Sequence, residues 1–142
     1  MSKHTQRTLK HYRDQGYIGD VIERWIIIPG IPGKGKRRDY LGFADILFFK
    51  PDEPDVLLIQ SCGQSYAEHL RKILEAPLAS EWVRMDNRRL IMMAWRKLLK
   101  KRGGKLKIWV PRIKEFTLED FEEHKQTPAP VPEDKTPAVN PK

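Results

Sequence analysis

The feature that most constrains the fold is a pair of apolar runs joined by a short acidic turn. The first run covers residues 42–49, the second covers residues 55–61, and the turn at 50–54 holds two prolines. Near-continuous apolar runs of this length are typical of strands buried on both faces of a sheet. Proline and aspartate between such runs favour a tight turn. We therefore expect a buried β-hairpin at the centre of the fold.

A carboxylate inside the first apolar run needs a physical explanation. Asp45 lies between Ala44 and Ile46, and burial of an unpartnered charge is costly. Gln60 ends the second run, where strand pairing brings it toward Asp45. Mg²⁺ prefers oxygen ligands, usually one or two carboxylates with waters and substrate phosphates. The pattern predicts a Mg²⁺ (or Mn²⁺) site at Asp45 and Gln60, with Glu23 either as a third ligand or paired with an arginine.

The order of the remaining elements predicts an α/β fold with a mixed sheet flanked by helices. A helix between the second central strand and the next strand forms a βαβ crossover, which places helices on both faces of the sheet. Ser65 and Thr117 each begin a pattern typical of a helix capping box. The expected elements are a helix at 4–15, a strand at 17–28, the central hairpin, helices after Ser65 and Pro77, strands at 89–99 and 106–116 joined through Gly103-Gly104, and a helix after Thr117.

Length and composition limit the domain organisation. A chain of 142 residues is expected to form one domain, here residues 1–125, followed by a proline-rich disordered tail at 126–142. The single cysteine excludes a disulfide framework and a cysteine-rich zinc site. The sequence shows neither a signal peptide nor an apolar run long enough to span a membrane, so we expect an intracellular protein without a membrane partner.

The charge balance favours a nucleic-acid partner. The chain has 27 lysines and arginines against 19 acidic residues, a net charge of +8, and the tail contributes none of it. A basic domain of this kind is typical of polyanion binding, although a merely basic protein is the simpler alternative. Contacts to phosphates would position DNA without reading its sequence. The candidate DNA-binding residues are Lys34, Lys36, Arg37, Arg38, Arg71, Lys100, Lys101, Arg102 and Lys105.

Four segments together resemble the PD-(D/E)xK nuclease superfamily. They are ERW at 23–25, RRDYLGFADIL at 37–47, LLIQSC at 57–62, and a following helix that bears HLRKI at 69–73. More closely, they are similar to small phage-encoded and prophage-encoded nuclease-like proteins related to archaeal-type Holliday junction resolvases and to the VRR-NUC group. The resemblance covers most of residues 5–114 and implies a restriction-endonuclease-like mixed sheet.

The resemblance also implies roles for individual residues. Asp45 matches the metal-binding aspartate of the first motif, and Gln60 takes the position of the second acidic ligand, as in the VRR-NUC pattern. Cys62 stands where these nucleases have a catalytic lysine, and a thiol does not supply a positive charge. Lys72 is a candidate replacement for that lysine, or else a solvated helix cation. Asp39 is a secondary candidate, expected instead to pair with Arg37 or Arg38.

The implied function is a metal-dependent endonuclease that hydrolyses phosphodiester bonds in branched DNA, with a Holliday junction as the preferred substrate. Two opposed cuts imply a two-fold homodimer acting in the cytoplasm of a bacterial host cell. Trp82, Trp95 and Trp109 are candidates for the dimer interface, or else core residues. The alternatives are a catalytically decayed nuclease fold that only binds DNA, and an RNA-binding accessory protein, which rests on charge alone.

Overall fold

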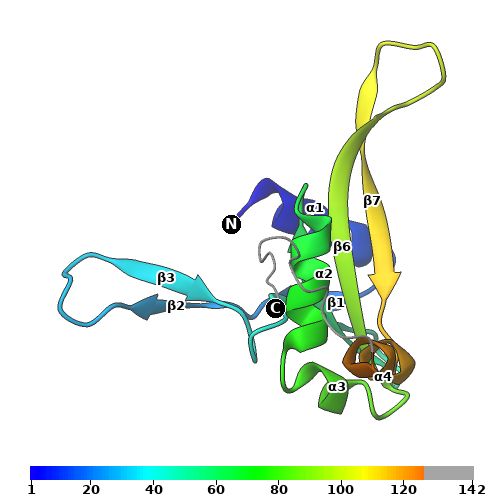
Figure 1. The fold of residues 1–142 in the computed structure, drawn as a ribbon. Coiled ribbons are helices and arrows are strands. Elements are labelled where there is room, and N and C mark those ends of the chain that lie inside the picture. Colours follow the sequence, from blue (N-terminus) through cyan, green and yellow to red (C-terminus); the bar gives the residue numbers. More distant parts are fainter. Residues whose placement is uncertain (127–142) are drawn as a thin grey trace, which may run out of the picture.

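The computed structural model describes residues 1–126, which form a mixed α/β fold around a five-stranded sheet (Figure 1). The strand order is β1-β4-β5-β6-β7, and only the β5–β6 pair is parallel. This arrangement confirms the predicted fold class. The sheet consists of β1 (Ile18–Val21), β4 (Ile46–Phe49), β5 (Val56–Cys62), β6 (Arg88–Leu99) and β7 (Lys107–Glu115).

Helices cover both faces of this sheet. Helix α1 (Lys3–Arg13) packs Leu9 and Tyr12 on one face, together with Phe48 and other residues of the central strands. The opposite face carries α2 (Tyr66–Glu75), α3 (Ala79–Trp82) and α4 (Leu118–Gln126). Alternate residues of each buried strand supply the two apolar clusters, as the two-residue period of a strand requires. The near-continuous apolar runs therefore reflect burial of the central strands on both sides.

The chain passes from β5 through α2 and α3 to the parallel strand β6, which confirms the predicted βαβ crossover. The two predicted capping boxes have different outcomes. At α4, the Thr117 N–H donates to Asp120 Oδ2 at 2.8 Å, and the Asp120 N–H reaches Thr117 Oγ1 at 3.4 Å. Ser65 does begin α2, but its hydroxyl bonds to His69 Nδ1 at 3.0 Å and caps no backbone N–H. The capping box predicted at Ser65 is therefore wrong.

The predicted single strand at 17–28 is wrong, and the predicted loop at 29–36 is present but ends at residue 34, because Gly35 and Lys36 belong to a strand. The pairing of β1 with β4 ends at Val21 and Ile46. The chain then leaves the sheet, and β2 (Arg24–Ile27) pairs instead with β3 (Gly35–Arg38) in a separate two-stranded sheet. Residues 29–34 of the basic loop therefore form the tip of a β-hairpin, and its last two residues begin the second strand of that hairpin.

The first central strand begins at Ile46 and not at Gly42 as predicted. Residues 39–44 form a tight turn, in which the Gly42 N–H donates to Asp39 O and the Phe43 N–H donates to Tyr40 O. Leu41 and Gly42 adopt positive φ values of 54° and 84°. Glycine takes this left-handed conformation readily, but leucine takes it only at a steric cost. The turn brings the chain back over the start of β4.

Two hairpins project from the body in different directions (Figure 1). We call them the β2–β3 arm (residues 24–38) and the β6–β7 arm (residues 96–107). None of the helices described in residues 1–126 is long and apolar enough to cross a membrane. Gln126 is the last residue of α4, and the rest of the predicted tail lies outside the described residues. The predicted domain boundary stays a prediction.

Candidate metal site

Asp45 and Gln60 face each other across two neighbouring strands. Ile46 pairs with Ile59 in the β4–β5 register, so the preceding residue Asp45 lies opposite Gln60. Both side chains are buried, with 5% and 3% of their surface exposed. Gln60 Nε2 donates to Asp45 Oδ2 at 3.3 Å, and the Ser61 N–H donates to Asp45 Oδ1 at 3.2 Å. The predicted convergence of these two residues is therefore present.

Two more carboxylates join Asp45. Oxygen atoms of Glu23, Asp39 and Asp45 all lie within 4.8 Å of one another. Glu23 stands just before β2, and Asp39 stands just after β3. The β2–β3 arm thus begins and ends at the cluster, and the turn at 39–44 carries the chain from Asp39 to Asp45. Three acidic groups gather where the arm meets the sheet.

The electrostatics of this cluster are unfavourable without a cation. Burial, together with the neighbouring Asp39 and Glu23 carboxylates, raises the pKa of Asp45 to about 8, although the Ser61 N–H and Lys72 act in the opposite direction. Like charges in a low-dielectric site disfavour ionisation. A divalent cation would reverse this effect, because its charge stabilises all three carboxylates in their ionised form.

Gln60 carries a buried polar atom without a partner. Its Oε1 atom is buried and has no hydrogen-bond partner among the described residues. An unsatisfied buried polar atom costs about 1–3 kcal/mol, so its retention calls for a reason. An amide oxygen is a suitable ligand for a hard cation, as are carboxylates. The three carboxylates of Glu23, Asp39 and Asp45 fit Mg²⁺ or Mn²⁺, whereas Gln60 presents Nε2 to Asp45 and would offer Oε1 only after its amide turns over.

Cations surround the carboxylates. Lys72 of α2 forms an ion pair with Asp39, and the Arg37 guanidinium lies 3.6 Å from Glu23 Oε1. Glu23 therefore pairs with an arginine, as one of its two predicted roles requires, and it also lies in the cluster, where its role as a metal ligand stays a prediction. The predicted pairing of Asp39 with Arg37 or Arg38 is wrong, because the turn aims Asp39 at the helix. Lys72 reaches the cluster through this ion pair.

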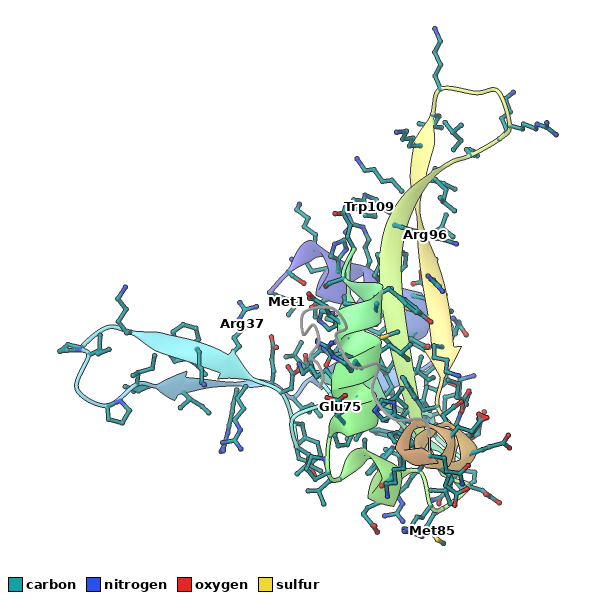
Figure 2. The ribbon with its side chains drawn as sticks, viewed as in Figure 1. Met1, Arg37, Glu75, Met85, Arg96 and Trp109 are labelled. Atoms are coloured by element: carbon teal, nitrogen blue, oxygen red, sulfur yellow. The ribbon has the colours of Figure 1, made fainter. Side chains whose placement is uncertain are left out.

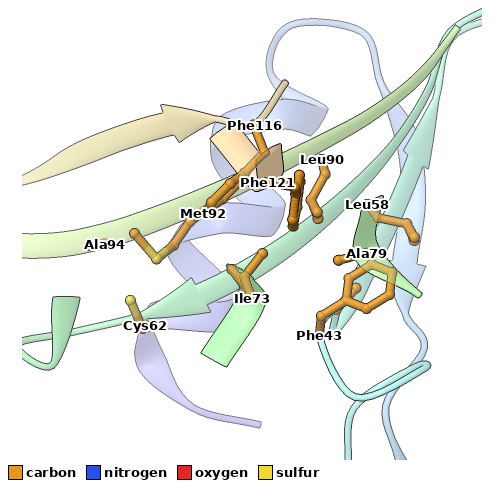
Figure 3. Close-up of a cluster of buried hydrophobic side chains, with 11 residues drawn as sticks. Phe43, Leu58, Cys62, Ile73, Ala79, Leu90, Met92, Ala94, Phe116 and Phe121 are labelled. Atoms are coloured by element: carbon orange, nitrogen blue, oxygen red, sulfur yellow. The ribbon is translucent and has the colours of Figure 1, made fainter. Parts of the chain in front are cut away.

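Cys62 belongs to the core on the α2 face of the sheet. It packs in the apolar cluster that includes Ile73 and Met92 (Figure 3). Burial and the nearby Asp45 raise the pKa of the Cys62 thiol to about 11, while Lys72 lowers it. A thiol in this environment stays protonated and is a poor ligand and nucleophile. The residue at the lysine position of the resemblance is thus structural.

The predicted DNA-binding residues lie mainly on the two arms and are exposed. Figure 2 shows Arg37 where the β2–β3 arm joins the body. Arg71 is exposed on α2, apart from both arms. The β2–β3 arm carries Lys34, Lys36, Arg37 and Arg38, and the β6–β7 arm carries Lys100, Lys101, Arg102 and Lys105.

The three tryptophans considered for an interface do not form one apolar surface. Trp95 is buried, and its indole N–H donates to Thr8 Oγ1 at 2.9 Å. Trp82 is partly buried, and its indole N–H donates to Arg89 O at 2.8 Å. Trp109 remains partly exposed on β7. The alternative of core residues is therefore correct for Trp95, and Trp82 packs against the core from α3.

Comparison of this chain with known protein families, with curated proteins and with solved structures finds no match.

Proposed function

We propose that the protein is a Mg²⁺-dependent endodeoxyribonuclease of the PD-(D/E)xK type, acting on branched DNA. The observation that carries this proposal is the convergence of Glu23, Asp39 and Asp45 beside the buried side chain of Gln60. Hydrolysis of a phosphodiester requires charge stabilisation and an activated water. A set of three carboxylates is suited to hold the cation that provides both, and Gln60 could add an amide oxygen once its amide turns over.

Each residue has a distinct part in the proposed site. Asp45, Glu23, Asp39 and Gln60 would hold the cation, which supplies Lewis acidity and an activated water when bound. Asp45 is fixed by the Ser61 N–H and by Gln60 Nε2, so its carboxylate is already oriented. Lys72 stands at the margin of the cluster, bound to Asp39. Once a cation shares Asp39, the Lys72 ammonium is available to a phosphate oxygen.

The surroundings suit a nucleic-acid backbone. A groove of about 430 Å³ beside the cluster is lined by Ile26, Asp39 and Gly42 and by the four cations Lys36, Arg37, Arg38 and Lys72. A second groove of about 270 Å³ is lined in part by Arg24, Arg38 and Asp39. Asp39 thus borders both grooves. Arginine and lysine at such positions bind phosphates by charge-assisted hydrogen bonds.

The proposal extends to assembly and location. Resolution of a four-way junction needs two opposed cuts, so we propose a two-fold homodimer. The protein would act on DNA in the cytoplasm of a bacterial cell. Sedimentation of the protein with and without a four-way junction measures the assembly directly.

The second candidate function is DNA binding without cleavage. The specific observation in its favour is Cys62, which is buried and apolar where related nucleases have a lysine. In the absence of metal, Lys72 is also engaged in an ion pair with Asp39, so this nearby ammonium is not free to contact a phosphate. In this alternative, the arms bind DNA and the carboxylate cluster is a remnant.

The test is cleavage of a labelled four-way junction beside a matched linear duplex, with Mg²⁺ or Mn²⁺ and with EDTA. We expect metal-dependent paired nicks in the junction. Asp45→Asn should abolish them and leave junction binding within about twofold, because the phosphate contacts lie on the arms. Asp52→Asn in the exposed turn is the matched control and should cleave normally. Tight binding without any cut by the wild type would favour the second candidate.

A further inference from the structure

The β2–β3 arm has a composition that a merely structural hairpin does not need. Residues 24–38 contain five lysines and arginines and no aspartate or glutamate. The arm belongs to a sheet of its own, and it extends away from the five-stranded sheet (Figure 1). It also presents large apolar side chains to solvent, among them Trp25 and Ile27. An exposed apolar patch within a basic surface indicates an interaction site.

Trp25 has one covered and one open face. An added Cβ at Gly35 would lie 2.4 Å from the Trp25 ring, so the indole rests directly on the backbone of the opposite strand. Trp25 is nevertheless 62% exposed. The indole is therefore supported on one side by Gly35, and its other side is open to solvent. Glycine is required here because any larger residue would displace the ring.

Trp109 shows what a satisfied surface tryptophan looks like in this protein. The Arg7 guanidinium lies 3.9 Å from the centre of its ring, and the Lys97 ammonium lies 5.2 Å away. The edge of the His4 ring also contacts Trp109, with centroids 5.2 Å apart. Within residues 1–126, Trp25 has no such cation–π or aromatic partner. Its open face lacks the partners that cover the ring of Trp109.

The arm places one cation on the same face as this open ring and others on the opposite face of the hairpin. Arg37 is directly opposite Trp25 in the strand register, and Arg24 is opposite Arg38. Arg38 also lines both grooves beside the carboxylate cluster. A flat aromatic surface on an arm that carries cations and no acidic residue is a combination that binds single-stranded nucleic acid, because bases stack on the ring while cations contact the backbone. Charge complementarity therefore selects a polyanion with exposed flat rings.

We propose that Trp25 is a stacking platform for an unpaired nucleobase, and that the DNA bound at the neighbouring carboxylate site contains unpaired nucleotides. A fully paired duplex keeps its bases inside the stack and offers no open face to the indole. This inference rests on the proposed function in taking DNA as the ligand. It does not depend on cleavage, so binding in EDTA tests it even if the carboxylate site is inactive.

The experiment compares binding of a labelled single-stranded oligothymidylate and of a blunt duplex, by fluorescence anisotropy in EDTA. Trp25→Ala should weaken binding of the oligothymidylate by roughly tenfold and leave duplex binding within about twofold. Trp25→Phe should retain most of the affinity, because phenylalanine keeps an aromatic face. Gly35→Ala should weaken binding as well, by displacing the ring. Trp109→Ala is the matched control and should not discriminate between the two ligands.

A second measurement uses protein that keeps an aromatic ring at this position and does not depend on the alanine variant folding. Oligothymidylate should quench part of the tryptophan fluorescence of the wild type, and Trp25→Phe should abolish that part. An equal loss of affinity for both ligands in Trp25→Ala would overturn the proposal. Two other results would also overturn it. One is dissociation of a homodimer by Trp25→Ala, and the other is a larger effect of Trp25→Ala on binding of oligouridylate than of oligothymidylate.

Discussion

Asp45 links the candidate site to the stability of the fold. Its pKa is raised from 3.8 to about 8, chiefly by burial and then by the neighbouring carboxylates. The unfolded chain releases this proton near pH 4, whereas the native protein keeps it until about pH 8. Between these values the native state binds more protons than the unfolded state. The free energy of unfolding therefore falls as the pH rises, in the absence of metal.

We predict that Asp45→Asn removes most of this pH dependence, because asparagine resembles the protonated carboxyl group. In EDTA at pH 8, the variant should be more stable than the wild type by up to a few kcal/mol. The difference should shrink toward pH 4. Urea unfolding at a series of pH values measures both effects.

Metal provides the control for this prediction. Mg²⁺ at pH 8 should raise the unfolding temperature of the wild type, because a ligand that binds only the native state stabilises it. It should not raise that of Asp45→Asn. A wild type whose stability is independent of both pH and Mg²⁺ would mean that the cluster neither strains the fold nor binds the ion.

Cys62 leads to a prediction about reactivity. The thiol is buried and its pKa is raised to about 11, so the native protein should react very slowly with a disulfide reagent at pH 8. Unfolding in urea should make the reaction fast. Cys62→Ala should leave DNA cleavage unchanged, because the thiol is part of the apolar cluster. Rapid labelling of the native protein would contradict this assignment.

At the scale of elements, the two helix starts predict different costs of the same kind of substitution. Thr117→Ala removes the hydroxyl that accepts the Asp120 N–H, and it should lower the free energy of unfolding by about 1 kcal/mol. Ser65→Ala should cost less, because the Ser65 hydroxyl bonds to His69 and caps no backbone N–H. Chemical denaturation of both variants checks the difference, and equal losses would show that the Ser65 interaction matters as much as a cap.

Some elements of this fold are predictable from the sequence, and others are not. Buried strands such as β5 are predictable because their apolar runs record burial on two faces. The β2–β3 arm buries almost nothing, so β3, with the sequence Gly-Lys-Arg-Arg, carries no apolar pattern to reveal it. β3 forms because β2 leaves the main sheet where the β1–β4 pairing ends, and the backbone groups of β2 then pair with those of β3.

The candidate site shows the same division. Asp45 and Gln60 are predictable because both interrupt apolar runs on neighbouring strands. The role of Asp39 is not predictable in the same way, and the sequence favours a pairing with a neighbouring arginine. Its actual position beside Asp45 depends on the tight turn at Leu41 and Gly42. The Leu-Gly pair after Asp-Tyr is the one local signal of that turn. The open face of Trp25 depends on the register of β2 and β3. This register pairs Trp25 with Arg37 and places Gly35, two residues before Arg37, beneath the indole ring.

For the whole molecule, the distribution of charge matters more than its total. The two arms hold twelve lysines and arginines and no acidic residue. The rest of the chain has 15 lysines and arginines against 19 aspartates and glutamates. The net positive charge of the protein therefore belongs entirely to the arms.

We predict that replacing Lys100, Lys101, Arg102 and Lys105 with glutamine weakens DNA binding and its salt dependence together. Each lost phosphate contact should reduce the slope of log K against log salt by about 0.9 on duplex DNA. Replacing Lys10, Arg13 and Lys125 on the body is the control and should change the slope little. Titrations at several salt concentrations provide the slopes. Equal changes for both variants would show that binding follows net charge alone.

The separation of charge between arms and body also makes the protein a permanent electric dipole. In the field of a polyanion such as the proposed DNA substrate, such a molecule experiences a torque before any contact forms, and this torque would turn its arms toward the polyanion. The acidic body is meanwhile repelled, which suppresses encounters in unproductive orientations. The carboxylate cluster lies at the root of one arm, so on the proposed function the torque that orients the molecule would also bring this cluster to the DNA backbone. Raising the ionic strength shortens the range of this guidance, and the rate of association should fall even where the final contacts are unchanged.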